Sequence, residues 1–137
     1  MSTTQMGLAG GSETTSAGQV ETKLEVVILP VSDVDRAKRF YESLGWRLDA
    51  DFSEGDWRAV QFTPPGSQCS VIFGKGVTTA VPGSMQGTFL IVDDIGAARA
   101  DLIARSVPLS EVFHFDVGLH VGPTKRAPGP DLSLIHI

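Results

Sequence analysis

The sequence predicts an α+β fold made of two tandem βαβββ modules, of which the second is incomplete. Apolar, β-branched runs alternate with segments whose apolar residues recur at helical spacing. The chain also matches itself when it is shifted by 61 residues, which places Leu29 on Leu90. Too few strand-like segments follow the second predicted helix to complete the second copy.

Length and composition indicate one globular domain. The chain has 137 residues, of which 42% are hydrophobic and 20% charged, and this balance is typical of a packed core rather than a disordered chain. Lys and Arg number 11 against 16 Asp and Glu, so the net charge is −5, and no basic cluster predicts a nucleic-acid partner. No apolar run reaches the ~18 residues of a membrane span, and no secretory signal is recognisable. We therefore expect a cytoplasmic protein.

The first module, residues 23–76, begins with a strand. Residues 1–22 are rich in Ser, Thr and Gly without periodicity, which predicts a disordered leader. Residues 24–31 are almost wholly apolar and β-branched, which predicts a strand covered on both faces.

A helix is predicted from Val34 to Leu44. Ser32, with an acidic residue three positions later, forms a weak capping box at its start. Gly45 follows at the position where a helix end favours a left-handed residue. One apolar stripe is formed by Val34, Ala37, Phe40, Tyr41 and Leu44.

Three strands are predicted after this helix, over residues 46–52, 57–63 and 69–73. The turn signals Ser-Glu-Gly-Asp and Pro-Pro-Gly-Ser separate them, and Gly74 is predicted to end the third strand. The first unit therefore has the order βαβββ.

The second module, residues 86–131, repeats the beginning of the first. We predict a strand over 86–92, a helix from Asp93 to about Arg105, a strand over 108–115 and a loop over 116–130. The identical pairs of the repeat are Leu29 and Leu90, Val31 and Val92, Asp33 and Asp94, Ala37 and Ala98, Leu48 and Leu109, and Phe52 and Phe113. These matches fall on strand ends, helix caps and buried stripes, as a repeated supersecondary unit requires.

The first strand and helix carry a family resemblance. Residues 29–37 (Leu-Pro-Val-Ser-Asp-Val-Asp-Arg-Ala), with Phe40-Tyr41 and Leu44-Gly45 after them, resemble the vicinal oxygen chelate superfamily of glyoxalases, bleomycin-resistance proteins and extradiol dioxygenases. The resemblance covers about residues 23–131. It implies a curved mixed sheet around a cleft, and it implies pairing of modules within or between chains, so we expect a homodimer.

The metal-binding positions implied by the resemblance are not occupied by metal ligands here. The first-strand position five residues before Val31 is Val26, and its counterpart in the second module is Gly87. Neither side chain can coordinate an ion. We therefore expect no metal and no cofactor.

The C-terminal residues 132–137 depart from the family pattern. They resemble a translated vector or adapter sequence, so we expect a non-native tail and a fragment of a longer protein. The alternative is a short final strand that pairs with a neighbour.

Ligand-binding candidates follow from the cleft that the resemblance implies, and they are Val26, Ile28, Arg58, Phe73, Phe89 and His114. Arg58 and Gln61 are three residues apart on one predicted strand, so at most one of them faces the cleft. The alternative for Arg58 is a solvated surface side chain, and the alternative for the aromatic residues is the core.

Two other features have a simpler interpretation than catalysis. His114 and His120 lie six residues apart, a spacing that fits no common zinc pattern. Cys69 is the single cysteine and lies between a turn and an apolar strand, where a small buried side chain is expected. The catalytic residues, if any, are unknown.

The sequence thus favours a protein that binds a small, largely apolar or aromatic molecule without a family-type metal. One alternative is a lyase, isomerase or dioxygenase of the same superfamily. Another is an incomplete fragment without activity, because a truncated second module leaves sheet edges unpaired.

Overall fold

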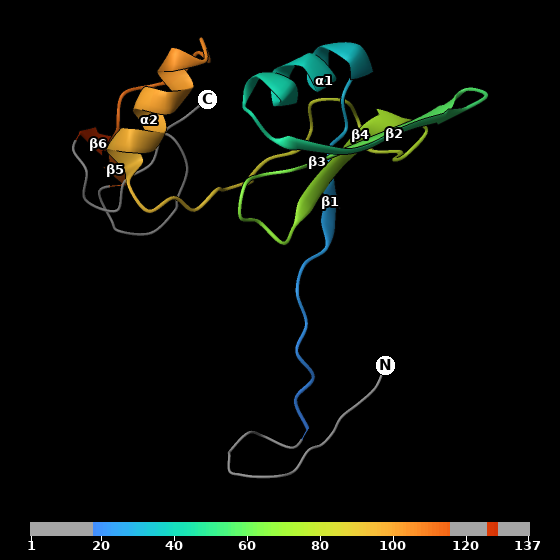
Figure 1. Cartoon of the computed structure of the whole chain (residues 1–137), viewed down its shortest axis with the longest axis horizontal. Helices are drawn as coiled ribbons and strands as arrows, with labels where there is room; N and C mark the ends of the chain where they lie inside the picture. Colours follow the sequence, from blue (N-terminus) through green and yellow to red (C-terminus); the bar gives the residue numbers. More distant parts are fainter. Residues whose placement is uncertain (1–17, 116–125, 129–137) are drawn as a thin grey trace.

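The structure, a computed structural model, describes residues 18–115 and 126–128. Its elements are β1 (Val26–Ile28), α1 (Val34–Ser43), β2 (Arg47–Glu54), β3 (Trp57–Thr63), β4 (Ser70–Lys75), α2 (Ile95–Ala104), β5 (Phe113–Phe115) and β6 (Arg126–Pro128). Most of the predicted disordered leader, residues 1–22, and all of the predicted tail, residues 132–137, lie outside the described residues. The predicted α+β class is confirmed (Figure 1).

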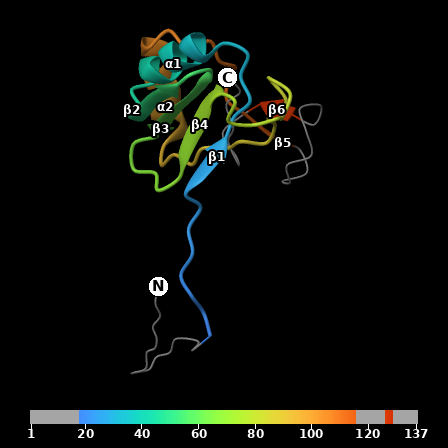
Figure 2. The same ribbon diagram turned by 90° about the vertical axis from the view of Figure 1, so that its right-hand side faces the viewer.

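Four strands form one open mixed sheet in the order β1-β4-β3-β2. β1 runs parallel to its neighbour β4, as Figure 2 shows, and the other two pairings are antiparallel. A two-residue turn joins β2 to β3, and its first residue, Gly55, has a φ of +59°, which glycine adopts without a steric penalty. The predicted βαβββ order of the first module is confirmed.

Two strand predictions need correction. The predicted strand 24–31 shrinks to the three residues of β1, and Ile28 is 39% exposed, because α1 covers only one face of the sheet. β4 continues through Gly74, which was predicted to end it. A Cβ on Gly74 would lie 1.8 Å from the carbonyl oxygen of Arg58, so only glycine fits where these two strands approach.

The residue that caps the start of α1 lies one position later than predicted, at Asp33. The Asp33 side chain accepts a hydrogen bond from the backbone amide of Arg36 at 3.0 Å, so Asp33, and not Ser32, satisfies the free amides of the first turn. Gly45 has a φ of +79° directly after the helix, as predicted.

The hydrophobic core lies between α1 and the sheet. Val60, Phe62 and Phe73 are fully buried, and Val34, Ala37 and Tyr41 of α1 pack against the core. The ring of Tyr41 on α1 stacks on Phe73 with the ring centroids 5.5 Å apart. Burial raises the pKa of the Tyr41 hydroxyl. This packing fixes which face of the sheet the helix covers.

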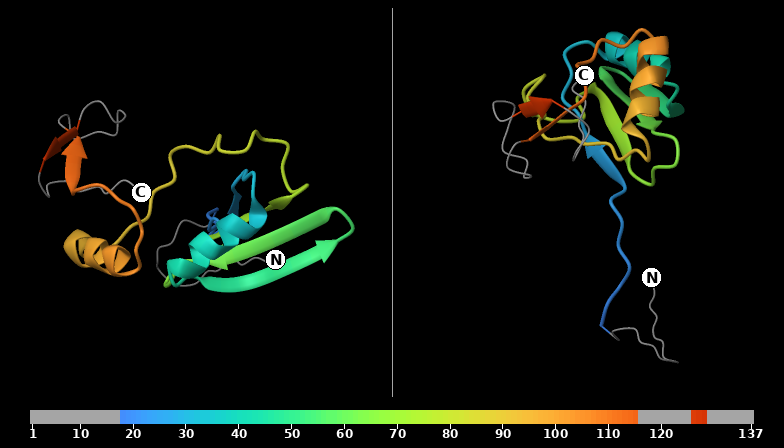
Figure 3. Two further views of the ribbon diagram at one scale, coloured as in Figure 1. Left: turned by 90° about the horizontal axis from the view of Figure 1, so that it is seen from above. Right: turned by 90° about the vertical axis from the view of Figure 1, so that its left-hand side faces the viewer.

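The predicted strand over residues 86–92 is wrong. Residues 86–92 contain no strand, and the Ile91 side chain is 98% exposed. Gly87 has a φ of +80°, and this left-handed conformation interrupts the extended backbone that a strand needs. Figure 3 shows this part of the chain leading away from the sheet to α2.

α2 repeats the capping of α1. The Asp94 side chain accepts a hydrogen bond from the amide of Ala97 at 3.0 Å, as its counterpart does on α1. Ser106 occupies the position equivalent to Gly45 and has a φ of +63°, a conformation that costs a non-glycine residue about 1 kcal/mol. The repeat therefore holds for both helices and their ends.

The strands after α2 also differ from prediction. β5 covers only the last three residues of the predicted strand 108–115, and in the segment before it the Arg99 side chain donates to the Ser110 carbonyl at 3.0 Å. β6 lies within the predicted loop 116–130 and pairs with β5. Its short Arg-Ala-Pro run has no alternation that could reveal a strand.

Candidate functional site

The two faces of the four-stranded sheet differ in what lies against them. α1 packs on one face, which we call the helix-covered face, and no described helix lies on the opposite, uncovered face (Figure 1). Strand register assigns to the uncovered face Val26, Ile28, Arg47, Ala50, Phe52, Glu54, Trp57, Ala59, Gln61, Thr63, Ser70, Ile72 and Gly74. We take the uncovered face as the candidate site because exposed apolar surface of this kind marks binding regions.

Apolar side chains occupy the centre of the uncovered face and the end nearest the β2–β3 turn. Phe52 is 56% exposed and Trp57 41% exposed, and their rings meet edge to face with centroids 5.9 Å apart. Gly74 and Ala59 lie opposite each other in the register beside this pair. Two of the smallest residues of the face thus adjoin two aromatic rings, where a flat molecule could contact both rings and backbone.

A hydrogen-bond network occupies the other end of the uncovered face. The Asp49 carboxylate, at a register shift in β2, accepts bonds from Arg47 Nε at 2.5 Å, from Gln61 Nε2 at 3.5 Å and from the Thr63 hydroxyl. The Thr63 and Ser70 hydroxyls are 2.6 Å apart, and both residues are buried. The bonds from Thr63 and Arg47 lower the pKa of Asp49, so this carboxylate stays ionised at neutral pH.

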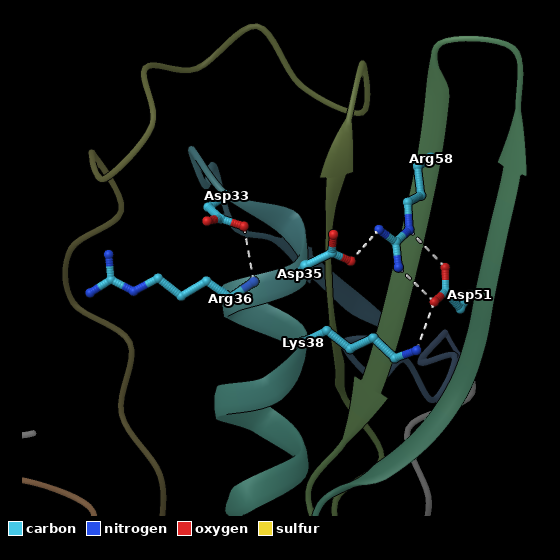
Figure 4. Close-up of polar contacts among 6 residues, drawn as sticks. All are labelled: Asp33, Asp35, Arg36, Lys38, Asp51 and Arg58. Carbon is cyan, nitrogen blue, oxygen red and sulfur yellow. Dashed lines mark hydrogen bonds and ion pairs between the residues drawn. The ribbon is translucent and has the colours of Figure 1, made fainter.

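A second charged cluster lies on the helix-covered face (Figure 4). Arg58 donates to Asp51 from Nε at 2.9 Å and from Nη2 at 2.8 Å, and to Asp35 on α1 from Nη1 at 2.7 Å. Lys38 adds an ion pair to Asp51 at 2.9 Å. The bonds from Arg58, and then from Lys38, hold the pKa of Asp51 well below its usual range, and the bonds to Asp51 and Asp35 raise the pKa of Arg58. This cluster ties α1 to β2 and β3.

The structure separates the residues that the sequence proposed as a ligand site. Val26 and Ile28 lie on the uncovered face. Arg58 lies on the helix-covered face with every guanidinium nitrogen bonded to a carboxylate. Phe73 is fully buried in the core, so it has no surface to offer to a ligand.

The other proposed residues lie away from the sheet. Phe89 is 53% exposed in the segment that precedes α2. His114 belongs to β5, which pairs with β6 and not with the four-stranded sheet. His120 lies outside the described residues. Cys69 is half-buried and precedes β4, and its Sγ lies 3.6 Å from the Ser70 carbonyl.

Sequence reasoning missed Arg47, Asp49, Phe52 and Ile72 as members of this face. The alternation along β3 correctly separated Arg58 from Gln61. No signal in the sequence located the register shift that turns Asp49 toward Thr63.

The side chains of the described ranges give no cluster suited to a metal. No group of three or more His, Cys, Asp or Glu within residues 18–115 and 126–128 is close enough to hold an ion. Neither α1 nor α2, the helices of these ranges, has the length and apolarity needed to cross a bilayer.

Comparisons with known proteins agree with this architecture. A model of the Glyoxalase/Bleomycin resistance protein/Dioxygenase superfamily matches residues 23–116. The chain is similar to TnmS3, an antibiotic binding protein from Streptomyces sp. CB03234, with 34% identity, a TM-score of 0.57, and coverage of 66% of this chain and 76% of that chain. A glyoxalase/bleomycin resistance protein from the same organism shows 35% identity, a TM-score of 0.55, and coverage of 64% and 77%.

A third solved structure, SMU.1112c, shares the fold at 19% identity, with a TM-score of 0.51 and coverage of 70% of this chain and 84% of that chain. The search of curated proteins finds no match. The family model covers more than half of the chain, and the resemblance seen in the first strand and helix is thereby confirmed. The chain belongs to the glyoxalase/bleomycin resistance protein/dioxygenase superfamily.

Proposed function

We propose that this chain binds a small, largely apolar or aromatic molecule on the uncovered face of its sheet, without a family-type metal ion. The observation that carries the proposal is the exposure of large apolar side chains on a face that no described helix covers. Ile28 is 39%, Trp57 41% and Phe52 56% exposed there. Burial of apolar surface contributes about 25 cal/mol per Å², so a flat ligand gains affinity mainly from area.

The relatives support the same class of function. One similar structure is described as an antibiotic binding protein and another as a glyoxalase/bleomycin resistance protein. Both are more than 30% identical to this chain. Within one superfamily, fold does not fix activity, so the side chains of the uncovered face decide between binding and catalysis.

Those side chains favour binding over metal-dependent catalysis. Val26 stands where the family resemblance implies a first-strand ligand, and Gly87 stands at the equivalent position of the second module. The carboxylate of Asp49 is already occupied by three donors. This donor set does not fit a divalent ion, which requires several free oxygen or nitrogen ligands.

We further propose that residues 23–131 act as one binding domain in the cytoplasm, with a second copy of the chain completing the site as a homodimer. Light scattering of the purified chain measures its mass. A monomer at all concentrations would contradict the homodimer and leave ligand binding to be tested by itself.

The binding proposal is tested by titrating the chain with neutral aromatic probes: naphthalene-2-carboxamide, indole and acridine. We expect NMR shifts at Ala59, Gln61 and Ile72, and at the Trp57 indole. Ile72→Glu places a charge on the uncovered face and should weaken binding at least about tenfold. Ile103→Glu, on exposed α2, is the matched control and should bind like the wild type.

Absence of shifts with every probe would overturn the binding proposal, and so would shifts confined to other parts of the chain. Circular dichroism confirms that each variant is folded. Metal analysis after dialysis against Ni²⁺, Zn²⁺, Fe²⁺ and Mn²⁺ tests the second half of the proposal. One tightly bound ion per chain that Ile72→Glu or Asp49→Asn displaces would contradict it.

A further inference from the structure

Arg47 is only partly bound by the protein. Its Nε donates to Asp49 at 2.5 Å, and no acceptor in the described part of the chain lies within bonding distance of its two Nη groups. The side chain is 73% exposed. Since a guanidinium carries five N–H donors in a planar fork, four of them remain available to a ligand.

The orientation of Arg47 is fixed by a chain of hydrogen bonds. Asp49 is only 18% exposed and is held by the Thr63 hydroxyl, which lies 2.6 Å from the hydroxyl of buried Ser70. Gln61 donates to the same carboxylate from 3.5 Å. The aspartate therefore acts on the guanidinium as a rigid, ionised anchor, and the remaining donors have a defined direction.

Arg47 also lies next to the apolar part of the uncovered face. It pairs with Thr63 in the register, and the next row across the strands contains Gln61 and Ile72. Neighbouring strands are about 4.8 Å apart and two residues span about 6.6 Å along a strand, so the backbones of Arg47 and Ile72 lie roughly 12 Å apart on this face. A molecule with two fused rings and one polar substituent, bound at the guanidinium, spans most of that distance.

We propose that Arg47 binds a carboxylate or a similar planar anionic oxygen group of the ligand, and that the aromatic part of the same ligand lies over Ile72. This inference rests on the proposed binding function and adds the chemical class of the ligand. The protein carries a net charge of −5, so long-range attraction does not favour anions. The preference for an acidic ligand must therefore come from this arginine.

The test compares naphthalene-2-carboxylate with naphthalene-2-carboxamide, which has nearly the same shape and no charge. By isothermal titration calorimetry we expect the wild type to bind the acid about tenfold more tightly than the amide. Arg47→Met keeps the aliphatic stem and should abolish this preference, because it weakens binding of the acid far more than binding of the amide, which loses only a neutral hydrogen bond. Asp49→Asn should reduce the preference in part, because it loosens the anchor.

Arg36→Met is the matched control. The Arg36 side chain extends away from the neighbouring charged cluster (Figure 4), and its loss should leave the acid preference intact. Equal binding of acid and amide by the wild type would overturn the role of Arg47 and leave the proposed function standing. An acid preference that survives in Arg47→Met would overturn it as well. Failure of both probes to bind would overturn the proposed function itself and this inference with it.

Discussion

Arg47 and Arg58 lie on adjacent strands of one sheet, each beside an aspartate of β2, and they differ in how many of their donors the protein uses. Arg58, on the helix-covered face, bonds Asp51 through two nitrogens and Asp35 through the third. Arg47, on the uncovered face, bonds Asp49 through Nε alone. The Arg58 side chain is only 24% exposed, whereas the Arg47 side chain is 73% exposed.

The number of bonded nitrogens distinguishes an arginine with a structural role from one that can bind a ligand, although the residue type is the same. An arginine whose three nitrogens are all bonded to carboxylates stabilises the packing of α1 on the sheet and has few donors left for a ligand. An arginine held at one nitrogen is oriented and still has donors for an incoming oxygen. The same distinction applies to the apolar residues, because Phe73 fills the core whereas Ile72, its neighbour in β4, points to the uncovered face.

The largest expected effect comes from this pair of neighbours. Phe73→Ala should lower the free energy of unfolding by about 3–5 kcal/mol, because it leaves a cavity in a fully buried site. Ile72→Ala should cost less than about half as much, since its side chain is only half-buried. Urea unfolding followed by circular dichroism measures both values. Equal losses in the free energy of unfolding would mean that the uncovered face is packed as tightly as the helix-covered face.

An intermediate effect is expected from Asp51→Asn. The substitution removes the negative charge that Arg58 and Lys38 both bind, and we expect a loss of about 1–2 kcal/mol at pH 7, after allowance for solvent screening. The folded-state pKa of Asp51 lies below the ordinary value of about 3.9. Its stabilisation is therefore complete above that ordinary pKa, and it is lost as the pH falls toward the folded-state pKa.

Unfolding measured between about pH 6 and pH 2 checks the sign of this effect. The wild type should lose stability more steeply than Asp51→Asn as the pH falls below about 4, because only the wild type must protonate this carboxylate. Asp56→Asn, at the fully exposed turn between β2 and β3, should change stability at pH 7 by less than about 0.5 kcal/mol. Parallel acid profiles for wild type and Asp51→Asn would show that the cluster does not stabilise the fold.

Much of the helix-covered face could be predicted from the sequence, because it depends on local patterns. The apolar stripe of α1 and the bounds of β3 both follow from spacing within a few residues. Alternation also placed Arg58 and Gln61 on opposite faces. These features depend only on residues close together in the sequence, and the same local patterns produce the internal repeat and the family resemblance.

The uncovered face could be predicted only in part, because its composition depends on contacts between distant residues. The side of β3 that α1 covers is set by the packing of Tyr41 on Phe73, two residues far apart in the sequence. Arg58 was therefore assigned to a ligand and Arg47 was overlooked. The segment 86–92 has the composition of a strand, yet a strand also needs a partner, which its own residues do not specify.

The smallest expected effect tests whether the bonds between Arg58 and Asp51 hold α1 on the sheet without Lys38. Lys38→Met removes an ion pair of 2.9 Å in which the lysine is 27% exposed, and the two bonds between Arg58 and Asp51 remain. We expect a loss of about 0.5 kcal/mol in 0.1 M salt that disappears in 1 M salt, because a partly exposed pair is screened. Lys75→Met, whose partner Asp56 is fully exposed, is the control and should have no measurable effect. A loss above about 1.5 kcal/mol at either salt concentration would mean that the bonds between Arg58 and Asp51 depend on Lys38. The contrast with Arg47 would then come from the whole charged cluster and not from Arg58 alone.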